Sequence, residues 1–158
     1  MKKVYFDIMQ MDKCISVYIK DLEVIRAGTS VYSMPVKHKN EEYQRFAKEY
    51  DIHFIFDDNV PKIDFYTIPQ VDVFAVDSDG GYIGSLGQTT DIEGESPICY
   101  INKDKKCYLI ATNGKVFLEN ADSWREKAAL FTDIEFFESL EDAKKKYEFV
   151  DVEKYITD

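Results

Sequence analysis

Residues 77–80, read as Asp-Ser-Asp-Gly, are the stretch that most resembles a metal-binding loop. An EF-hand calcium loop counted from Asp77 needs an Asp or Asn at position five, a Gly at position six and a Glu at position twelve. The sequence places Gly81, Tyr82 and Gln88 at these positions. The ligand set is therefore incomplete, and we expect an ordinary turn with no bound metal.

Histidines and cysteines are too few and too scattered to predict a catalytic or metal centre. His38 and His53 are separated by fifteen positions with no cysteine between them. The cysteines at 14, 99 and 107 lack CxxC spacing, and no serine lies in a GxSxG turn. We assign no catalytic residue and no cofactor, and we expect surface histidines, reduced thiols and no enzymatic activity.

Three glycines spaced by three, Gly81, Gly84 and Gly87, follow a predicted strand. They match neither the dinucleotide-binding nor the phosphate-loop pattern, and no base between Lys62 and Lys103 could hold a phosphate. Glycines at such positions permit a bulge or close packing on a strand. The alternative is a small-molecule-binding or enzymatic domain with a pocket near Gly84 and Gly87.

Acidic residues are concentrated in the middle third of the chain. The whole chain of 158 residues carries a net charge of −10, and residues 51–100 hold ten acids but only one base. Such a field repels nucleic acid and attracts a basic protein, although acids in solvated turns explain the count equally well. The candidate contacts for a basic partner are Asp57, Asp58, Asp77, Asp79, Asp91, Glu93, Glu95 and the aromatic anchor Tyr82.

The chain has the composition of one compact α+β domain over residues 1–158. Hydrophobic residues make up 45% of it, and no Pro/Gly/Ser-rich linker divides it. No uncharged stretch approaches the roughly 18 residues needed to span a bilayer. We therefore expect a cytoplasmic protein without a membrane segment.

The first third of the sequence alternates between strand and helix patterns. Apolar residues alternate over 4–11 and again over 14–20, which predicts an N-terminal hairpin. Residues 22–34 are interpreted as loop and strand. Asn40 is a plausible N-cap for a helix over 40–50, and a short strand over 52–56 follows.

The central third predicts consecutive antiparallel strands. A strand beginning at Val71 turns back at residues 77–81, and Pro97 opens a further strand over 98–101. If residues 103–106 form the next turn, Cys99 and Cys107 lie on opposite faces of the hairpin, which excludes a disulfide between them.

The last third contains one open alternative. Asn113-Gly114 is a strong hairpin signal, yet Thr112 could instead cap a short helix reaching Asn120. A capping box at Ser123 predicts a helix that carries Trp124, Ala128 and Phe131 on one face. A strand over 134–137, a helix over 140–147 and a tail docked through Phe149, Val152 and Tyr155 complete the prediction.

Residues 68–118 resemble the SUKH superfamily, a widespread set of bacterial domains of which many are immunity proteins against polymorphic toxins. The matching motifs are Phe74-Ala75 with Asp79-Gly80-Gly81, the proline-led strand 97–101, and Ala111 followed by Phe117-Leu118. The resemblance implies a central, mostly antiparallel sheet with packed helices, and it favours a helix ending in Phe117-Leu118. It also implies a protein that neutralises a basic, nuclease-type toxin through its acidic surface.

Overall fold

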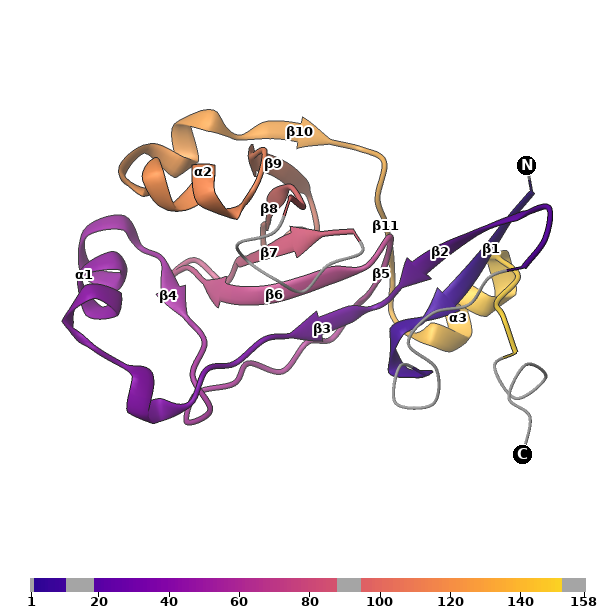
Figure 1. Cartoon of the computed structure of the whole chain (residues 1–158), viewed down its shortest axis with the longest axis horizontal. Helices are drawn as coiled ribbons and strands as arrows, with labels where there is room; N and C mark the ends of the chain where they lie inside the picture. The colour runs from indigo at the N-terminus through magenta and orange to yellow at the C-terminus, as the bar shows by residue number, and fades with distance from the viewer. Residues whose placement is uncertain (1, 11–18, 88–94, 152–158) are drawn as a thin grey trace.

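A mostly antiparallel β-sheet forms the centre of the molecule (Figure 1). The computed structural model describes residues 2–10, 19–87 and 95–151. The strand order is β10-β9-β8-β7-β6-β3, β4 also pairs with β6, and only the β3–β6 pairing is parallel. The strands are β3 (Thr29–Val31), β4 (His53–Phe54), β6 (Val71–Val76), β7 (Tyr82–Leu86), β8 (Ile98–Ile101), β9 (Cys107–Ala111) and β10 (Ala129–Phe131).

The hairpin of β6 and β7 confirms the turn predicted at residues 77–81. Its register shifts between Val73 and Ala75, where β6 carries a bulge. Gly84 lies opposite Val73, and a Cβ added to Gly84 would stand 2.7 Å from the carbonyl oxygen of Asp72. Glycine at this position therefore allows the bulged strand to approach closely, as the sequence predicted.

One face of the sheet is covered by two α-helices and a 3-10 segment. These are α1 (Glu41–Tyr50), α2 (Gly114–Glu119) and η3 (Ala121–Lys127). Their apolar side chains pack on the sheet in a cluster formed by Phe46, Ile52, Phe74, Ala75, Ile83, Ile98, Ile110, Phe117, Ala121 and Trp124. Burial of this apolar surface fixes both helices against the strands.

Side-chain caps explain where the helices begin. Asn40 accepts a hydrogen bond from the Tyr43 N–H at 3.1 Å, which confirms the helix predicted over 40–50. Asn113 accepts one from the Val116 N–H at 2.9 Å and starts α2. The alternative left open at Asn113-Gly114 is thus decided for the helix, although the cap is Asn113 and not the predicted Thr112.

The opposite face of the sheet packs against irregular chain and short elements. Its cluster contains Ile55, Phe65, Val71, Val73, Leu86, Cys99, Ile101 and Cys107. Beside it, β5 (Tyr66–Ile68) pairs with β11 (Glu135–Phe137), which confirms the strand predicted over 134–137. The short 3-10 turn η2 (Val36–His38) lies between β3 and α1 in the chain.

A third cluster joins the two ends of the chain. β1 (Lys2–Asp7), followed by the turn η1 (Ile8–Gln10), pairs in parallel with β2 (Leu22–Ala27). α3 (Leu140–Lys146) packs here, capped by Ser139 as predicted, and Phe149 bridges to Tyr5 (Figure 1). Of the tail residues predicted to dock, Val152 and Tyr155 lie outside the described residues.

The predicted N-terminal hairpin is wrong in its pairing. Residues 11–18, which would hold its turn and most of its second strand, lie outside the described residues. Among the described residues, β1 takes β2 as its partner and runs parallel to it. The strand predicted over 4–11 is correct only as far as Asp7, where β1 ends and the 3-10 turn Ile8–Gln10 begins. Alternation also does not identify the neighbour of a strand.

The predicted faces of the two cysteines are also wrong. The loop after β8 has five residues, because the Asn102 side chain accepts hydrogen bonds from the Asp104 and Lys106 N–H groups at 3.0 and 2.9 Å. Ile101 therefore pairs with Cys107, and Cys99 shares a buried cluster with Cys107. One residue more in the turn moves a thiol to the other face.

The helix predicted to start at Ser123 is wrong as well. The chain forms the 3-10 segment η3, kinked at Ser123, and then leaves as β10 to pair with β9. The Ser123 hydroxyl donates to the Asn120 carbonyl at 3.4 Å instead of capping a helix. Pairing with the exposed edge of β9 thus overrides the local helix signal.

The fold class is α+β in a single domain with helices packed on a central sheet, as predicted. Among residues 2–10, 19–87 and 95–151, no helix has the length and apolar character needed to cross a membrane.

Candidate functional site

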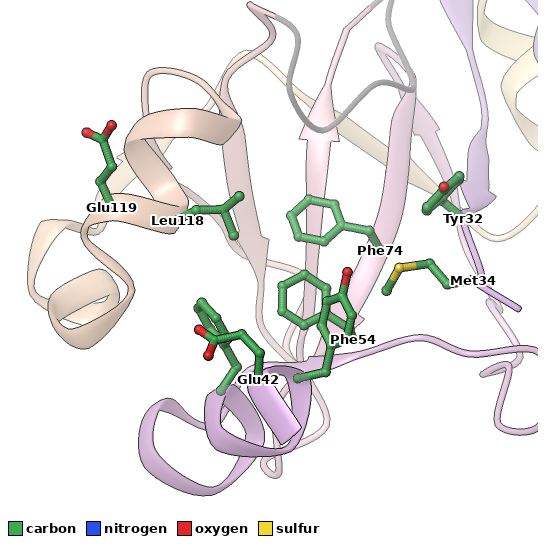
Figure 2. A pocket seen from close by; sticks show the side chains of 9 residues that line it. Tyr32, Met34, Glu42, Phe54, Phe74, Leu118 and Glu119 are labelled. Atoms are coloured by element: carbon green, nitrogen blue, oxygen red, sulfur yellow. The ribbon is translucent and has the colours of Figure 1, made fainter. Parts of the chain in front are cut away.

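An apolar groove opens between α1 and α2 on the helical face of the sheet (Figure 2). Its volume is about 480 Å³. The groove is lined by Tyr32, Met34, Glu42, Tyr43, Phe46, Phe54, Phe74, Leu118 and Glu119. A hollow of this size can accommodate one or two large side chains or a small ligand.

The sheet forms the base of the groove and the helices form its sides. Phe74 from β6 and Phe54 from β4 stack with their ring centroids 6.0 Å apart. Figure 2 shows Leu118 directed from α2 toward these rings, with Tyr32 and Met34 on the far side. The lining side chains come from five separate parts of the sequence, so only the fold brings them together.

The groove exposes apolar side chains that a closed core would bury. Tyr32 is 46% exposed and Leu118 is 37% exposed, while Phe74 beneath them is buried. Exposed apolar residues that adjoin one another mark interaction sites more often than scattered ones do.

The charged residues of the groove lining are both acids. Glu42 pairs with Arg45 on the same helix at 2.5 Å, and this hydrogen bond lowers the pKa of Glu42. Glu119 lies 4.0 Å from Lys115 and points away from the apolar side chains (Figure 2). Neither basic residue lines the groove. The lining therefore suits an apolar group that is flanked by positive charge.

A second notable cluster surrounds the turn between β6 and β7. We call Asp51, Asp77, Tyr100 and Arg125 the Arg125 cluster. One Arg125 nitrogen, Nη2, lies 2.9 Å from Asp51 Oδ2 and 3.0 Å from Asp77 Oδ2. The Tyr100 hydroxyl donates to Asp77 at 2.5 Å, and the guanidinium stacks over Trp124 at 4.3 Å.

Asp77 is held inside the turn. Its side chain is 0% exposed, and its Oδ1 accepts hydrogen bonds from the Asp79 and Gly81 N–H groups at 3.1 and 2.7 Å. A Cβ on Gly81 would collide with the Tyr100 ring, which explains why glycine stands there. Asp77 therefore fixes the turn, and a partner protein cannot contact it directly.

The pKa values of the Arg125 cluster follow from these contacts. Burial raises the pKa of Asp77, but the hydrogen bonds from Tyr100, Gly81 and Arg125 outweigh it, so the net pKa is lowered. Burial, together with the Asp77 carboxylate, raises the pKa of Tyr100 to about 12. The cluster is thus ionised on its aspartates and protonated on its tyrosine near neutral pH.

Three carboxylates in this region lie close enough to one another to be considered as metal ligands. Oxygens of Asp51, Asp77 and Asp79 lie within 4.8 Å of one another. Asp51 and Asp77 share the one Arg125 guanidinium, His53 contacts Asp51 at 2.9 Å, and Asp79 is exposed. The Asp51 and Asp77 carboxylates are therefore held by protein contacts, and the expectation of a turn without a bound metal stays a prediction.

The other predicted contact residues are divided among separate networks. Asp57 accepts a hydrogen bond from Ser33 at 2.5 Å, and Asp58 pairs with Lys39 at 3.0 Å; both aspartates are exposed. Asp79 and Glu95 are exposed too. Asp91 and Glu93 lie outside the described residues.

The aromatic anchor predicted at Tyr82 is half-buried. Its ring packs edge-on against Phe65, with centroids 5.4 Å apart, and burial followed by the charge of Asp64 raises its pKa. Tyr82 belongs to the cluster on the face opposite the helices. The prediction of an exposed tyrosine at this position is wrong, because a period-two pattern does not show which face later chain covers.

The space beside Gly84 is filled by β6, because a Cβ added there would stand 2.7 Å from the Asp72 carbonyl oxygen. The alternative of a pocket near Gly84 and Gly87 stays a prediction. Gly87 differs, because nothing stands within 4 Å of a Cβ added to it. Both histidines are exposed, as expected.

Sequence reasoning missed Tyr32, Met34 and Phe54 as groove residues and Arg125 as a partner of Asp77. The sequence did indicate that Leu118 is exposed. It is an apolar residue next to the buried Phe117 on a short helix, so its side chain must point away from the core. No such indication existed for Arg125, because its carboxylate partners are 48 and 74 positions away.

No protein-family model, curated protein or solved structure matches this chain.

Proposed function

We propose that this chain is a non-catalytic domain that binds a basic protein, and that the groove between α1 and α2 takes an apolar side chain of that partner. The observation that carries the proposal is the groove itself, in which half-exposed apolar side chains adjoin two acids and no base. Exposed aromatic and aliphatic residues supply the anchor in such interfaces.

The occupant we favour is a surface segment with a large apolar residue between lysines or arginines. The apolar side chain would replace water over Phe54, Phe74 and Leu118, and the basic residues would meet Glu42 and the net charge of −10. Beside the groove lies a smaller hollow that shares Tyr43 and Phe54 with it and includes Asp58. Asp58 thus lines a hollow that adjoins the groove, and Asp57 accepts a hydrogen bond from Ser33, which lies between the groove residues Tyr32 and Met34.

The resemblance to the SUKH superfamily favours a cytoplasmic immunity role. A nuclease toxin is basic where it grips phosphates, and an acidic protein can occlude that surface with fast, salt-sensitive association. Asp57, Asp58, Asp79 and Glu95 fit this role as exposed acids. Asp77 does not, because Arg125 and the turn already occupy it.

The direct test uses the protein encoded by the adjacent reading frame as the probe. We expect it to form a complex with this chain, and we expect the dissociation constant to rise at least tenfold between about 50 and 500 mM salt. If that protein is a nuclease, the complex should lack nuclease activity. A dissociation constant unaffected by salt would contradict the electrostatic part of the proposal.

Charge at the groove can be tested separately with matched variants. Glu42→Gln removes a carboxylate from the groove lining, whereas Glu138→Gln removes an exposed carboxylate outside it. We expect only Glu42→Gln to slow association. Equal effects of the two variants would mean that overall charge, and not the groove, attracts the partner.

A further inference from the structure

Another hollow, separate from the groove and from the hollow that contains Asp58, lies where β3 and the turn η1 meet the start of β6. Its volume is about 270 Å³. It is lined by Ile8, Met9, Ser30, Val31, Tyr32, Gln70 and Asp72. Tyr32 also lines the groove, but the polar residues of the two sites are different.

The polar floor of this hollow contains a buried carboxylate with a single partner among the described residues. Asp72 is 3% exposed, and the Ser30 hydroxyl donates to its Oδ1 at 2.7 Å. Among the described residues, no lysine, arginine or histidine pairs with it. Burial raises the pKa of Asp72 and the Ser30 hydrogen bond only partly offsets this, as expected for a carboxylate without a cation.

A second buried acceptor stands on the same side of the strand. Gln70 is two residues before Asp72, so their side chains share one face. Gln70 is 1% exposed, and its Oε1 has no hydrogen-bond partner among the described residues. Buried acceptors in folded proteins are normally satisfied, so this pair calls for a donor.

We infer that this pocket binds a small organic ammonium ion, with its N–H groups donated to Asp72 and Gln70 and its alkyl part against Ile8, Val31 and Tyr32. An ammonium group supplies the missing positive charge and up to three donors at one atom. The apolar walls favour an organic cation over a metal ion, because calcium requires six to eight oxygen ligands.

This inference does not rest on the proposed protein-binding function. The pocket also places a perturbed carboxylate on β6, the strand paired with the one that contains Gly84. It lies near the site that the sequence suggested for a small-molecule pocket, but on the neighbouring strand.

The test compares n-butylammonium with n-butanol, which has nearly the same shape but no charge. Both are titrated into the wild-type chain, and the carboxyl carbon signal of Asp72 is followed by NMR. We expect n-butylammonium to shift this signal and to bind at least tenfold more tightly than n-butanol. Equal binding of the two, or no binding of n-butylammonium, would overturn the inference, as would calcium shifting the signal at lower concentration.

A variant pair confirms the location. Asp72→Asn should keep the fold, because no cation in the described residues loses its partner, and it should weaken n-butylammonium binding at least tenfold. Asp79→Asn removes an exposed acid elsewhere and should bind as the wild type does. Unchanged binding by Asp72→Asn would place the ammonium ion outside this pocket. The ammonium titrations do not test the groove between α1 and α2. A negative result would therefore contradict the ammonium site and leave the proposed protein-binding function unaffected.

Discussion

The groove and the Arg125 cluster lie on the same helical face of the sheet, yet they differ in how completely their side chains are paired and buried. In the Arg125 cluster each charged group has a partner, and the aromatic rings of Tyr100 and Trp124 are in mutual contact. In the groove, aromatic rings form the base, but Tyr32 and Leu118 remain exposed beside it. Within the described residues, the charged groups of the first region are paired, whereas apolar side chains of the second stay partly exposed.

This difference changes how the acidic middle of the sequence is understood. Asp51 and Asp77 contribute to the charge count, but they share the Arg125 guanidinium from the last third of the chain, which offsets one of their two negative charges. A count of acids along a sequence therefore overstates the charge that a partner meets. We therefore base the proposed interaction surface on the exposed apolar residues of the groove and not on the acid count.

The largest expected effect comes from removing the aromatic support of the Arg125 cluster. Trp124 is buried, donates its indole N–H to the Tyr50 carbonyl at 2.8 Å and carries the guanidinium on its face. Trp124→Ala should lower the free energy of unfolding by about 3–5 kcal/mol. The measurement is urea denaturation, with Leu118→Ala as the matched groove variant, expected to lose less than about 1 kcal/mol because Leu118 is partly exposed.

A smaller effect is expected from removing the cation. Arg125→Met leaves the fully buried Asp77 carboxylate without its positive partner, while Tyr100 and the turn N–H groups remain. We expect a loss of about 1–3 kcal/mol in urea denaturation. Asp79→Asn serves as the control, with a change within about 0.5 kcal/mol. Equal stability of Arg125→Met and wild type would show that the cluster does not stabilise the turn.

The two regions should also differ in their dependence on pH. The pKa of Asp77 is lowered from an ordinary value of 3.8, so its contribution to stability is present above that pH and is lost as the pH falls through the folded value. Arg125→Met should therefore flatten the fall in stability below about pH 4. Leu118→Ala should leave the slope unchanged. Unfolding free energies between pH 7 and pH 2.5 provide the test.

The pH dependence of stability that Asp72 contributes should have the opposite sign to that of Asp77. Its pKa is raised above 3.8, so the folded chain binds its proton more tightly than the unfolded chain does, and stability decreases as the pH rises through the interval between the two values. Asp72→Asn should remove this decrease and increase stability at pH 7 slightly. A loss of stability at pH 7 in that variant would mean that the ionised carboxylate is compensated.

Local sequence signals predicted the helices, strands and turns better than they predicted which strands pair with one another. Asn40, Ser139 and the turn at residues 77–81 were correct because the chemistry of a cap or turn is contained within a few residues. The partner of β1 and the pairing of β10 depend on distant edges, which periodicity does not specify. The face of Cys107 depended on one extra residue in a loop.

The candidate site was less predictable than the fold. Its groove joins side chains from the segment after β3 and from β4, β6, α1 and α2, and no motif links them. The acids were visible in the sequence, but their pairing with Ser33, Lys39 and Arg125 was not. Long-range pairing is set by packing, so a charge pattern alone could not separate free acids from neutralised ones.

A comparison of two exposed leucines tests whether the groove is the binding surface. Leu118 lines the groove, and Leu130, which is 62% exposed, lies on β10 outside it. Each is changed to Glu, and the dissociation constant for the protein encoded by the adjacent reading frame is measured at one salt concentration. We expect at least a tenfold loss of affinity for Leu118→Glu and less than a twofold change for Leu130→Glu. Equal affinities of the two variants would contradict the assignment of the groove as the binding surface.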